Sequence, residues 1–358
     1  MGAVTDELRD ELDRLAAGAP TPDERRDQVV RAARRRSHVG MAVAGVIAVT
    51  GVLVGVLAVG AVLDRRETRP IGPTPTGVVR VSPTGSSPPP ADARGELAYF
   101  RDGPFGGSAQ LVVRNADGSD PRTIGDLSIS TSRLSIAPDG SEAVFDHGLG
   151  EGSGQLEVVD LSTGVSHAIF SVAQPQGPDW SPDGSTIVFS TDSGALFTIP
   201  ATGAAAGTAV RDEGDGRFLD GYGASWSPEG DAIVAVDDAG DVLVVEIDGT
   251  SPPRRLTSIG RAGWTDWGPN GIVVSTMVRG EWALYQLDPE NGAPPRPLLD
   301  RPGDEIAPEF SPDGNFLAFV GNDGDQQDLF VLDLETGRVD QLTDDAAQEV
   351  SPAWIPSS

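Results

Sequence analysis

A short aromatic motif that recurs along the chain constrains its fold more than any other feature. An apolar or aromatic residue precedes a turn of the Ser-Pro-Asp-Gly type at Ile136, Trp180, Trp226, Trp267 and Phe310, and Trp354-Ile-Pro follows near the C-terminus. The six prolines are separated by 44, 46, 41, 43 and 44 residues. A period in the forties with a repeated turn and short apolar strands is typical of four-stranded blades arranged around a channel. The sequence therefore predicts an all-β, six-bladed β-propeller.

The two ends of the repeat region are expected to complete one blade. Proline sets φ at the first central position of each repeated turn, and glycine accepts the positive φ that follows. Near the start, the apolar runs 96–100, 110–114 and 122–125 lack an inner strand, whereas 351–356 lacks outer strands. Pairing these segments would leave no exposed sheet edge. We expect the propeller to occupy residues 94–358.

The repeated Trp-Ser-Pro-Asp-Gly motif resembles the WD40-like repeats of TolB-type β-propellers, and the resemblance covers about three quarters of the chain. It implies the six-bladed fold. It implies no single activity, because TolB-like propellers serve as protein-binding platforms, as sensor ectodomains and as gating domains of peptidases. In contrast to TolB, we expect no α/β domain before the propeller.

One segment is predicted to cross a membrane. Residues 39–63 are 25 residues without a charge, about 37 Å as a helix, which crosses a hydrocarbon core of about 30 Å. Four arginines lie between 31 and 36, whereas those that follow the span are mixed with Asp64 and Glu67. This bias favours a cytoplasmic N-terminus and an extracytoplasmic propeller in a single-pass cell-membrane protein. A signal peptide is the alternative, but 38 residues precede the apolar run.

The segments on either side of the span differ in character. Residues 1–38 favour two short helices, the second opened by a capping box at 21–24, and are too few to form an independent core. They are either a docking element for a cytoplasmic partner or a lead-in to the membrane. Their composition resembles the cytosolic ends of actinobacterial membrane proteins that hold sigma factors, without the His-x3-Cys-x2-Cys motif. Residues 64–93 contain seven prolines and form an extended linker.

The charge of the predicted propeller excludes some partners. Residues 91–358 contain 44 Asp and Glu against 14 Arg, a surplus of 30 negative charges. Such a surface repels nucleic acid and anionic lipid headgroups. Two interpretations remain: a cationic partner or ligand, or an acid-biased surface that keeps the protein soluble.

The sequence offers little for catalysis. There is no Cys and no Gly-x-Ser-x-Gly elbow, and surface or packing roles are expected for His147 and His167. We therefore predict a protein that is not an enzyme.

A metal site is the chemical alternative. The residue before each repeated aromatic lies on an inner strand, and three of these residues are the carboxylates Asp179, Asp266 and Glu309. Facing one channel, they could hold Ca²⁺ or Mg²⁺, although the same carboxylates could instead accept backbone hydrogen bonds from neighbouring blades. Six-bladed lactonases also bind an axial cation, which makes a calcium-dependent hydrolase the enzyme alternative. No other cofactor is expected.

The two faces of the propeller are expected to differ. The Ser-Pro-Asp-Gly turns and the hairpins between third and fourth strands share one end of the blades, the regular face, and the variable loops lie on the opposite, variable face. Candidate ligand-binding residues there are Phe105, Arg217, Phe218, Tyr222, Trp264 and Trp282. The predicted function is binding or sensing of a protein, peptide or glycan of the cell envelope. The alternatives are a regulator of a cytoplasmic partner such as a sigma factor, and a purely structural surface protein.

Overall fold

The computed structural model describes residues 95–101, 108–129, 133–150, 152–203, 207–210, 221–249, 251–290, 293–299, 301–322 and 326–356. These residues belong to one compact unit, Gly72–Ser358. The predicted segments 1–38, 39–63 and 64–93 lie outside the described residues, as do Phe105, Arg217 and Phe218. The residues that are described include no helix with the length and apolar character needed to cross a membrane.

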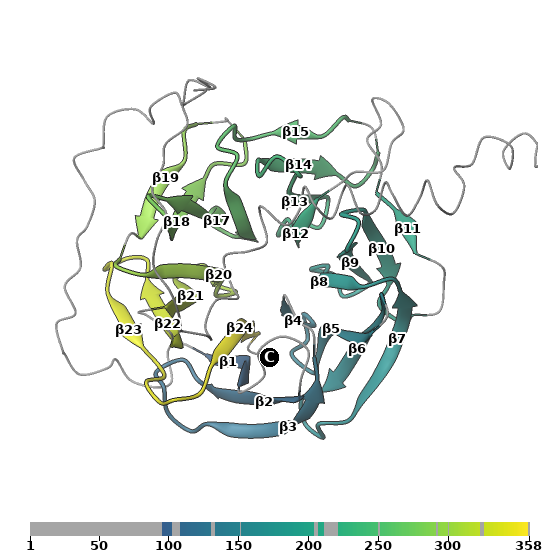
Figure 1. The fold of residues 1–358 in the computed structure, drawn as a ribbon, viewed down its shortest axis with the longest axis vertical. Coiled ribbons are helices and arrows are strands. Elements are labelled where there is room, and N and C mark those ends of the chain that lie inside the picture. The colour runs from purple at the N-terminus through teal and green to yellow at the C-terminus, as the bar shows by residue number, and fades with distance from the viewer. Residues whose placement is uncertain are drawn as a thin grey trace, which may run out of the picture. The chain divides into compact units, whose positions relative to one another are not determined.

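The described residues form six four-stranded antiparallel sheets that follow one another in a ring around a common centre (Figure 1). We number these blades 1 to 6. Blade 1 contains β24 (Glu349–Ile355), β1 (Glu96–Arg101), β2 (Ser108–Asn115) and β3 (Arg122–Ser128). Blade 2 contains β4 (Leu134–Ile136), β5 (Glu142–Gly150), β6 (Ser153–Asp160) and β7 (Ser166–Val172). Blade 3 contains β8 (Pro175–Trp180), β9 (Thr186–Thr191), β10 (Leu196–Pro200) and β11 (Thr208–Ala209).

Blade 4 contains β12 (Tyr222–Trp226), β13 (Ala232–Val236), β14 (Val242–Glu246) and β15 (Arg254–Arg255). Blade 5 contains β16 (Ala262–Gly268), β17 (Gly271–Val278), β18 (Glu281–Leu287) and β19 (Arg296–Leu299). Blade 6 contains β20 (Asp304–Phe310), β21 (Phe316–Asn322), β22 (Gln327–Asp333) and β23 (Val339–Gln341). The prediction of an all-β, six-bladed propeller is confirmed.

Blade 1 joins the two ends of the propeller. Its inner strand β24 pairs antiparallel with β1, and Trp354 is the register partner of Leu97. The blade is therefore built from both ends of the repeat region, as the unpaired apolar runs predict, and this pairing covers the edge that β1 would otherwise expose.

The repeated turn forms because its side chains bond its own backbone. In blade 3 the Asp183 carboxylate accepts the Ser185 amide at 3.0 Å, and the Ser181 hydroxyl accepts the Thr186 amide at 3.0 Å. Gly184 has φ +71°, a conformation that glycine adopts without strain. Similar bonds recur around Ser311 and Asp313 in blade 6. The motif therefore specifies a turn that brings the first and second strands of a blade into register.

The aromatic residues of the motif pack between neighbouring blades. Trp226 packs with Val188 and Leu196 of blade 3, and its indole donates to the Asp179 carbonyl at 3.2 Å. The Trp354 indole donates in the same way to the Glu309 carbonyl of blade 6 at 3.0 Å. Burial of these rings supplies both apolar packing and a hydrogen bond across the blade boundary.

Candidate functional site

The repeated position before each aromatic links the inner strands to one another. Asp179 on β8 accepts the Trp226 amide at 2.8 Å, and Asp266 on β16 accepts the Phe310 amide at 2.9 Å. Each acceptor binds the backbone of the next blade in the ring. Both Asp179 and Asp266 therefore serve as the backbone acceptors that the sequence left as an alternative to metal ligands.

Arg133 lies among the three predicted carboxylates. It immediately precedes β4, and its Nη2 is 2.8 Å from Asp266 Oδ1, 3.2 Å from Glu309 Oε2 and 3.4 Å from Asp179 Oδ1. Its Nη1 also donates to the Thr265 carbonyl at 3.1 Å. The predicted convergence of the carboxylates is thus present, with a guanidinium among them. We call these four residues the axial cluster.

The position of Arg133 in the axial cluster bears on the predicted calcium site, but it does not test whether calcium binds there. In the part of the chain that the structure describes, no group of three or more His, Cys, Asp and Glu side chains has the arrangement of a metal site. Calcium binding at Asp179, Asp266 and Glu309 stays a prediction. The ion would have to compete with the Arg133 guanidinium, which already supplies positive charge there.

Burial perturbs the protonation of the axial cluster. Burial raises the pKa of Glu309 well above its ordinary value, the charge of Asp266 raises it further, and Arg133 only partly offsets this rise. Burial also raises the pKa of Asp179. Burial alone would lower the pKa of Arg133, but the surrounding carboxylates outweigh it and raise that pKa, so the guanidinium stays charged. A proton on Glu309 would reduce the repulsion among the three carboxylates.

Sequence reasoning missed Arg133, although the repeat contains a signal for it. Counting three residues before each motif aromatic gives Arg133, Gly177, Gly223, Trp264, Ala307 and Ser351. The four small residues at this position have positive φ and lie at register shifts of the inner strands. A bulge changes where a side chain points. A long cation at a position otherwise held mostly by small residues marks Arg133 as a group that can reach the inner strands of other blades, as its contacts with the three carboxylates show.

Three of the predicted ligand-binding residues gather at the boundary of blades 4 and 5. Tyr222, with 37% of its surface exposed, begins β12 and donates its hydroxyl to the Ala262 carbonyl of β16 at 3.1 Å. The rings of Trp264 and Trp282 meet edge to face, with centroids 5.4 Å apart. We call Tyr222, Trp264 and Trp282 the aromatic patch. It lies on the variable face.

Local structure holds the aromatic patch in place. A Cβ atom at Gly263 would lie 2.8 Å from the Trp282 ring, so glycine is required for this close approach. Asp304 of blade 6 accepts the Trp282 amide at 2.8 Å, which fixes the start of β18. A preorganised aromatic surface loses little side-chain entropy on binding, and this suits it to a ligand.

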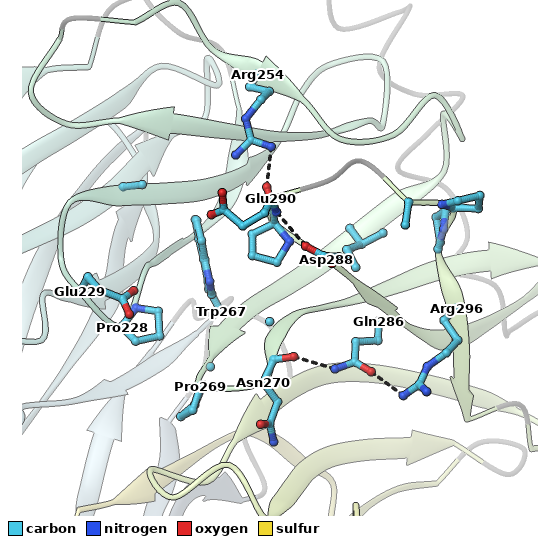
Figure 2. A pocket seen from close by; sticks show the side chains of 18 of the residues that line it. Pro228, Glu229, Arg254, Trp267, Pro269, Asn270, Gln286, Asp288, Glu290 and Arg296 are labelled. Atoms are coloured by element: carbon cyan, nitrogen blue, oxygen red, sulfur yellow. Dashed lines mark hydrogen bonds between the residues drawn. The ribbon is translucent and has the colours of Figure 1, made fainter.

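A groove at the other end of the same strands was not predicted. It has a volume of about 1210 Å³ and lies on the regular face between blades 4 and 5 (Figure 2). Its walls include Pro228, Glu229, Arg254, Trp267, Asn270 and Arg296. The available signal is the turn after Trp267, which is shorter than the others: Trp267 pairs with Ile272, whereas Trp226 pairs with Ile233.

Comparisons with known proteins agree on the architecture. No family model matches the chain. The protein TolB homolog of Chlorobium luteolum is 33% identical over 89 residues, which are 24% of this chain and 20% of that protein, so this chain matches only one fifth of its length. An uncharacterized protein of Agrobacterium fabrum is 25% identical over 231 residues, 63% of this chain and 74% of that protein.

Two solved structures have the same fold. TolB from Acinetobacter baumannii has a TM-score of 0.62 and 21% identity, over 75% of this chain and 68% of that one. A putative TolB from Agrobacterium tumefaciens has a TM-score of 0.55 and 18% identity, over 73% of this chain and 91% of that one. The described residues therefore form a TolB-like β-propeller, as the repeated motif predicts.

Proposed function

We propose that this chain is a single-pass cell-membrane protein that displays a TolB-like propeller outside the cytoplasm and binds a protein, peptide or glycan of the cell envelope. The observation that carries the binding function is the aromatic patch, where Tyr222, Trp264 and Trp282 come together from three different strands. Tyr222 is exposed, whereas Trp264 and Trp282 are partly buried. Preorganised Tyr and Trp side chains that reach the surface are frequent anchors of interfaces. The proposal is binding without catalysis.

The membrane part of the proposal is supported by the sequence. The uncharged run 39–63 is long enough to span a bilayer, and the arginines before it favour a cytoplasmic N-terminus. Residues 1–38 would then face the cytoplasm and could contact a partner such as a sigma factor. Residues 64–93 would separate the propeller from the membrane surface.

Cysteine labelling tests this orientation directly. Because the native chain contains no Cys, a membrane-impermeant maleimide can react only where a cysteine is introduced. In intact cells we expect Ser87→Cys to be labelled and Ser37→Cys to be protected until the cells are lysed. Labelling of Ser37→Cys and protection of Ser87→Cys in intact cells would reverse the proposed topology.

Substitution within the aromatic patch tests binding. Full-length protein would be purified from gently solubilised membranes, and co-purifying components compared by mass spectrometry. Trp282→Ala should reduce the recovery of a specific component at least about tenfold, as expected for a central aromatic anchor. Leu149→Ala is the matched control, because Leu149 is 54% exposed and lies at the end of β5, on the same face in blade 2. Equal recovery from both variants would speak against the aromatic patch as the binding site.

A further inference from the structure

Trp267 differs from the equivalent aromatic residues of the other blades. Trp180, Trp226, Phe310 and Trp354 are all at most 8% exposed, whereas Trp267 is only partly buried and lines the groove. The indoles of Trp180, Trp226 and Trp354 donate to backbone carbonyls. Among the described residues, the Trp267 indole makes no such hydrogen bond. Part of its ring packs against the core, and the rest lines the groove, where a ligand could contact it.

The shortened turn accounts for this exposure. Six residues separate Trp226 from its register partner Ile233, but only four separate Trp267 from Ile272. The turn also has glycine where serine follows Trp180, Trp226 and Phe310. A Cβ atom at Gly268 would lie 2.5 Å from the Phe310 ring. A shorter turn covers less of the ring beside it. The sequence change thus opens the groove at one blade boundary.

The groove carries an excess of negative charge. Its walls contain the carboxylates of Glu229, Asp231, Glu246, Asp288 and Glu290, against the guanidinium groups of Arg254 and Arg296.

Neither guanidinium neutralises this charge by pairing closely with a carboxylate of the groove. Arg254 donates to the Pro289 carbonyl, and Arg296 donates to the Gln286 amide oxygen at 2.7 Å (Figure 2). Within the described residues, the side chains of Glu229, Glu246 and Glu290 make no hydrogen bond or ion pair. The groove therefore attracts cations.

We propose that this groove binds an extended basic segment of a partner protein, with an arginine or lysine side chain over the Trp267 ring and its charged end near Glu229, Glu246 and Glu290. An indole face attracts a cation, and carboxylates form charge-assisted hydrogen bonds with it. The prolines of the walls, among them Pro228 and Pro269, provide rigid apolar contacts along an extended backbone. Charge complementarity selects a basic peptide over an acidic or neutral one.

This inference goes beyond the proposed function, because the groove and the aromatic patch lie at opposite ends of the same strands. It also gives a specific use to part of the surplus of 30 negative charges over residues 91–358, because five carboxylates and two guanidinium groups line the groove. Of the two interpretations of that surplus, it favours a cationic partner.

Fluorescence anisotropy with a defined peptide tests the proposal. The full-length protein in a zwitterionic detergent would be titrated against a fluorescein-labelled (Arg-Pro)4 peptide at 150 mM salt. The double variant Glu229→Gln/Glu290→Gln should weaken binding about tenfold. The control Asp126→Asn/Glu335→Gln removes the same charge from exposed positions outside the groove and should change the affinity less than about twofold, because distant exposed charges are screened.

Substitution of the indole separates a specific site from general attraction. Trp267→Leu should lose most of the affinity and Trp267→Phe, which keeps a weaker aromatic face, should fall between Leu and wild type. Near-ultraviolet circular dichroism would verify that each variant is folded. Equal weakening by both double variants, equal binding of (Glu-Pro)4, or unchanged affinity of a folded Trp267→Leu variant would each overturn the proposal. Trp282→Ala should leave peptide affinity unchanged, which separates this test from that of the aromatic patch.

Discussion

Arg133 shows how much one residue contributes to the centre of this propeller. Its guanidinium contacts carboxylates from blades 3, 5 and 6, although Arg133 itself belongs to blade 2. Each of these carboxylates is largely buried, and a buried charge is costly unless it is paired. Arg133 therefore connects four blades through electrostatic contacts that no other described residue makes.

Removing the guanidinium should destabilise the fold strongly. We expect Arg133→Met to lower the free energy of unfolding by about 3–5 kcal/mol, because it leaves buried carboxylates without their partner. Arg122→Met is the control: Arg122 forms a 3.4 Å ion pair with Glu96 on the surface, and its loss should cost less than about 1 kcal/mol. Urea denaturation followed by tryptophan fluorescence would measure both. Similar losses for the two variants would contradict the role assigned to Arg133.

For single residues, the sequence predicted which residues belong to a site better than it predicted the contacts that they make. The repeat placed Asp179, Asp266 and Glu309 on inner strands, and they do converge. The repeat marks Arg133 only by contrast with the small residues at most of the equivalent positions. A search for residues that recur therefore misses it. Tyr222 and Trp264 were selected for their type and loop position. Their proximity depends on a bulge in each inner strand, which no residue pattern specified.

At the scale of the strands, the pair formed by β24 and β1 contains a buried glutamic acid. Glu349 at the start of β24 is fully buried, and its Oε2 accepts the Thr343 hydroxyl at 3.0 Å. Burial raises its pKa to about 7; Asp345 and Asp328 also raise the pKa, while the Thr343 hydrogen bond and Arg101 lower it. The protonation of Glu349, on the strand that closes the ring, therefore changes with pH near neutrality, and the stability of the fold should change with it.

The sign of this pH effect follows from the raised pKa. The folded state holds the Glu349 proton more tightly than the unfolded state, whose pKa lies near 4.5. The contribution of Glu349 to the free energy of unfolding is complete below about pH 4.5 and is lost as the pH rises to about 7. Over this range the free energy of unfolding falls by at most about 1.4 kcal/mol per pH unit. Glu349→Gln, which stays neutral, should therefore be more stable than wild type at pH 8 but not at pH 4.5.

Denaturation across this pH range would measure the effect. The exposed control Glu335→Gln should follow the wild-type profile. A Glu349→Gln profile that runs parallel to wild type between pH 4.5 and 8 would contradict the assignment.

Most elements could be predicted because the turn chemistry is local. The runs 96–100, 110–114 and 122–125 fall within β1, β2 and β3, and their pairing with the C-terminal strand follows from counting strands in each repeat. The groove could not be predicted in the same way. The short turn after Trp267 is visible in the sequence, but the groove also needs walls from blade 4, and their distance depends on packing between blades.

At the scale of the whole molecule, the two faces of the propeller differ in their chemistry. The variable face presents the aromatic patch, and the regular face presents an acidic groove at the boundary of the same two blades. With the propeller held outside the membrane, the variable face would bind an envelope component and the regular face a basic segment. In this proposal the TolB-like fold carries both surfaces, and the residues on each face would provide selectivity.

Site-specific photo-crosslinking in intact cells tests the central claim of binding through the aromatic patch most directly. A benzophenone amino acid would replace Tyr222 in the full-length chain, and a control would carry it at Val165, which is 65% exposed and lies in a hairpin on the regular face. We predict one discrete cross-linked product from position 222 that disappears in the Trp282→Ala background, and no such product from position 165. The same products from both positions, or a product from position 222 that persists without Trp282, would contradict the claim.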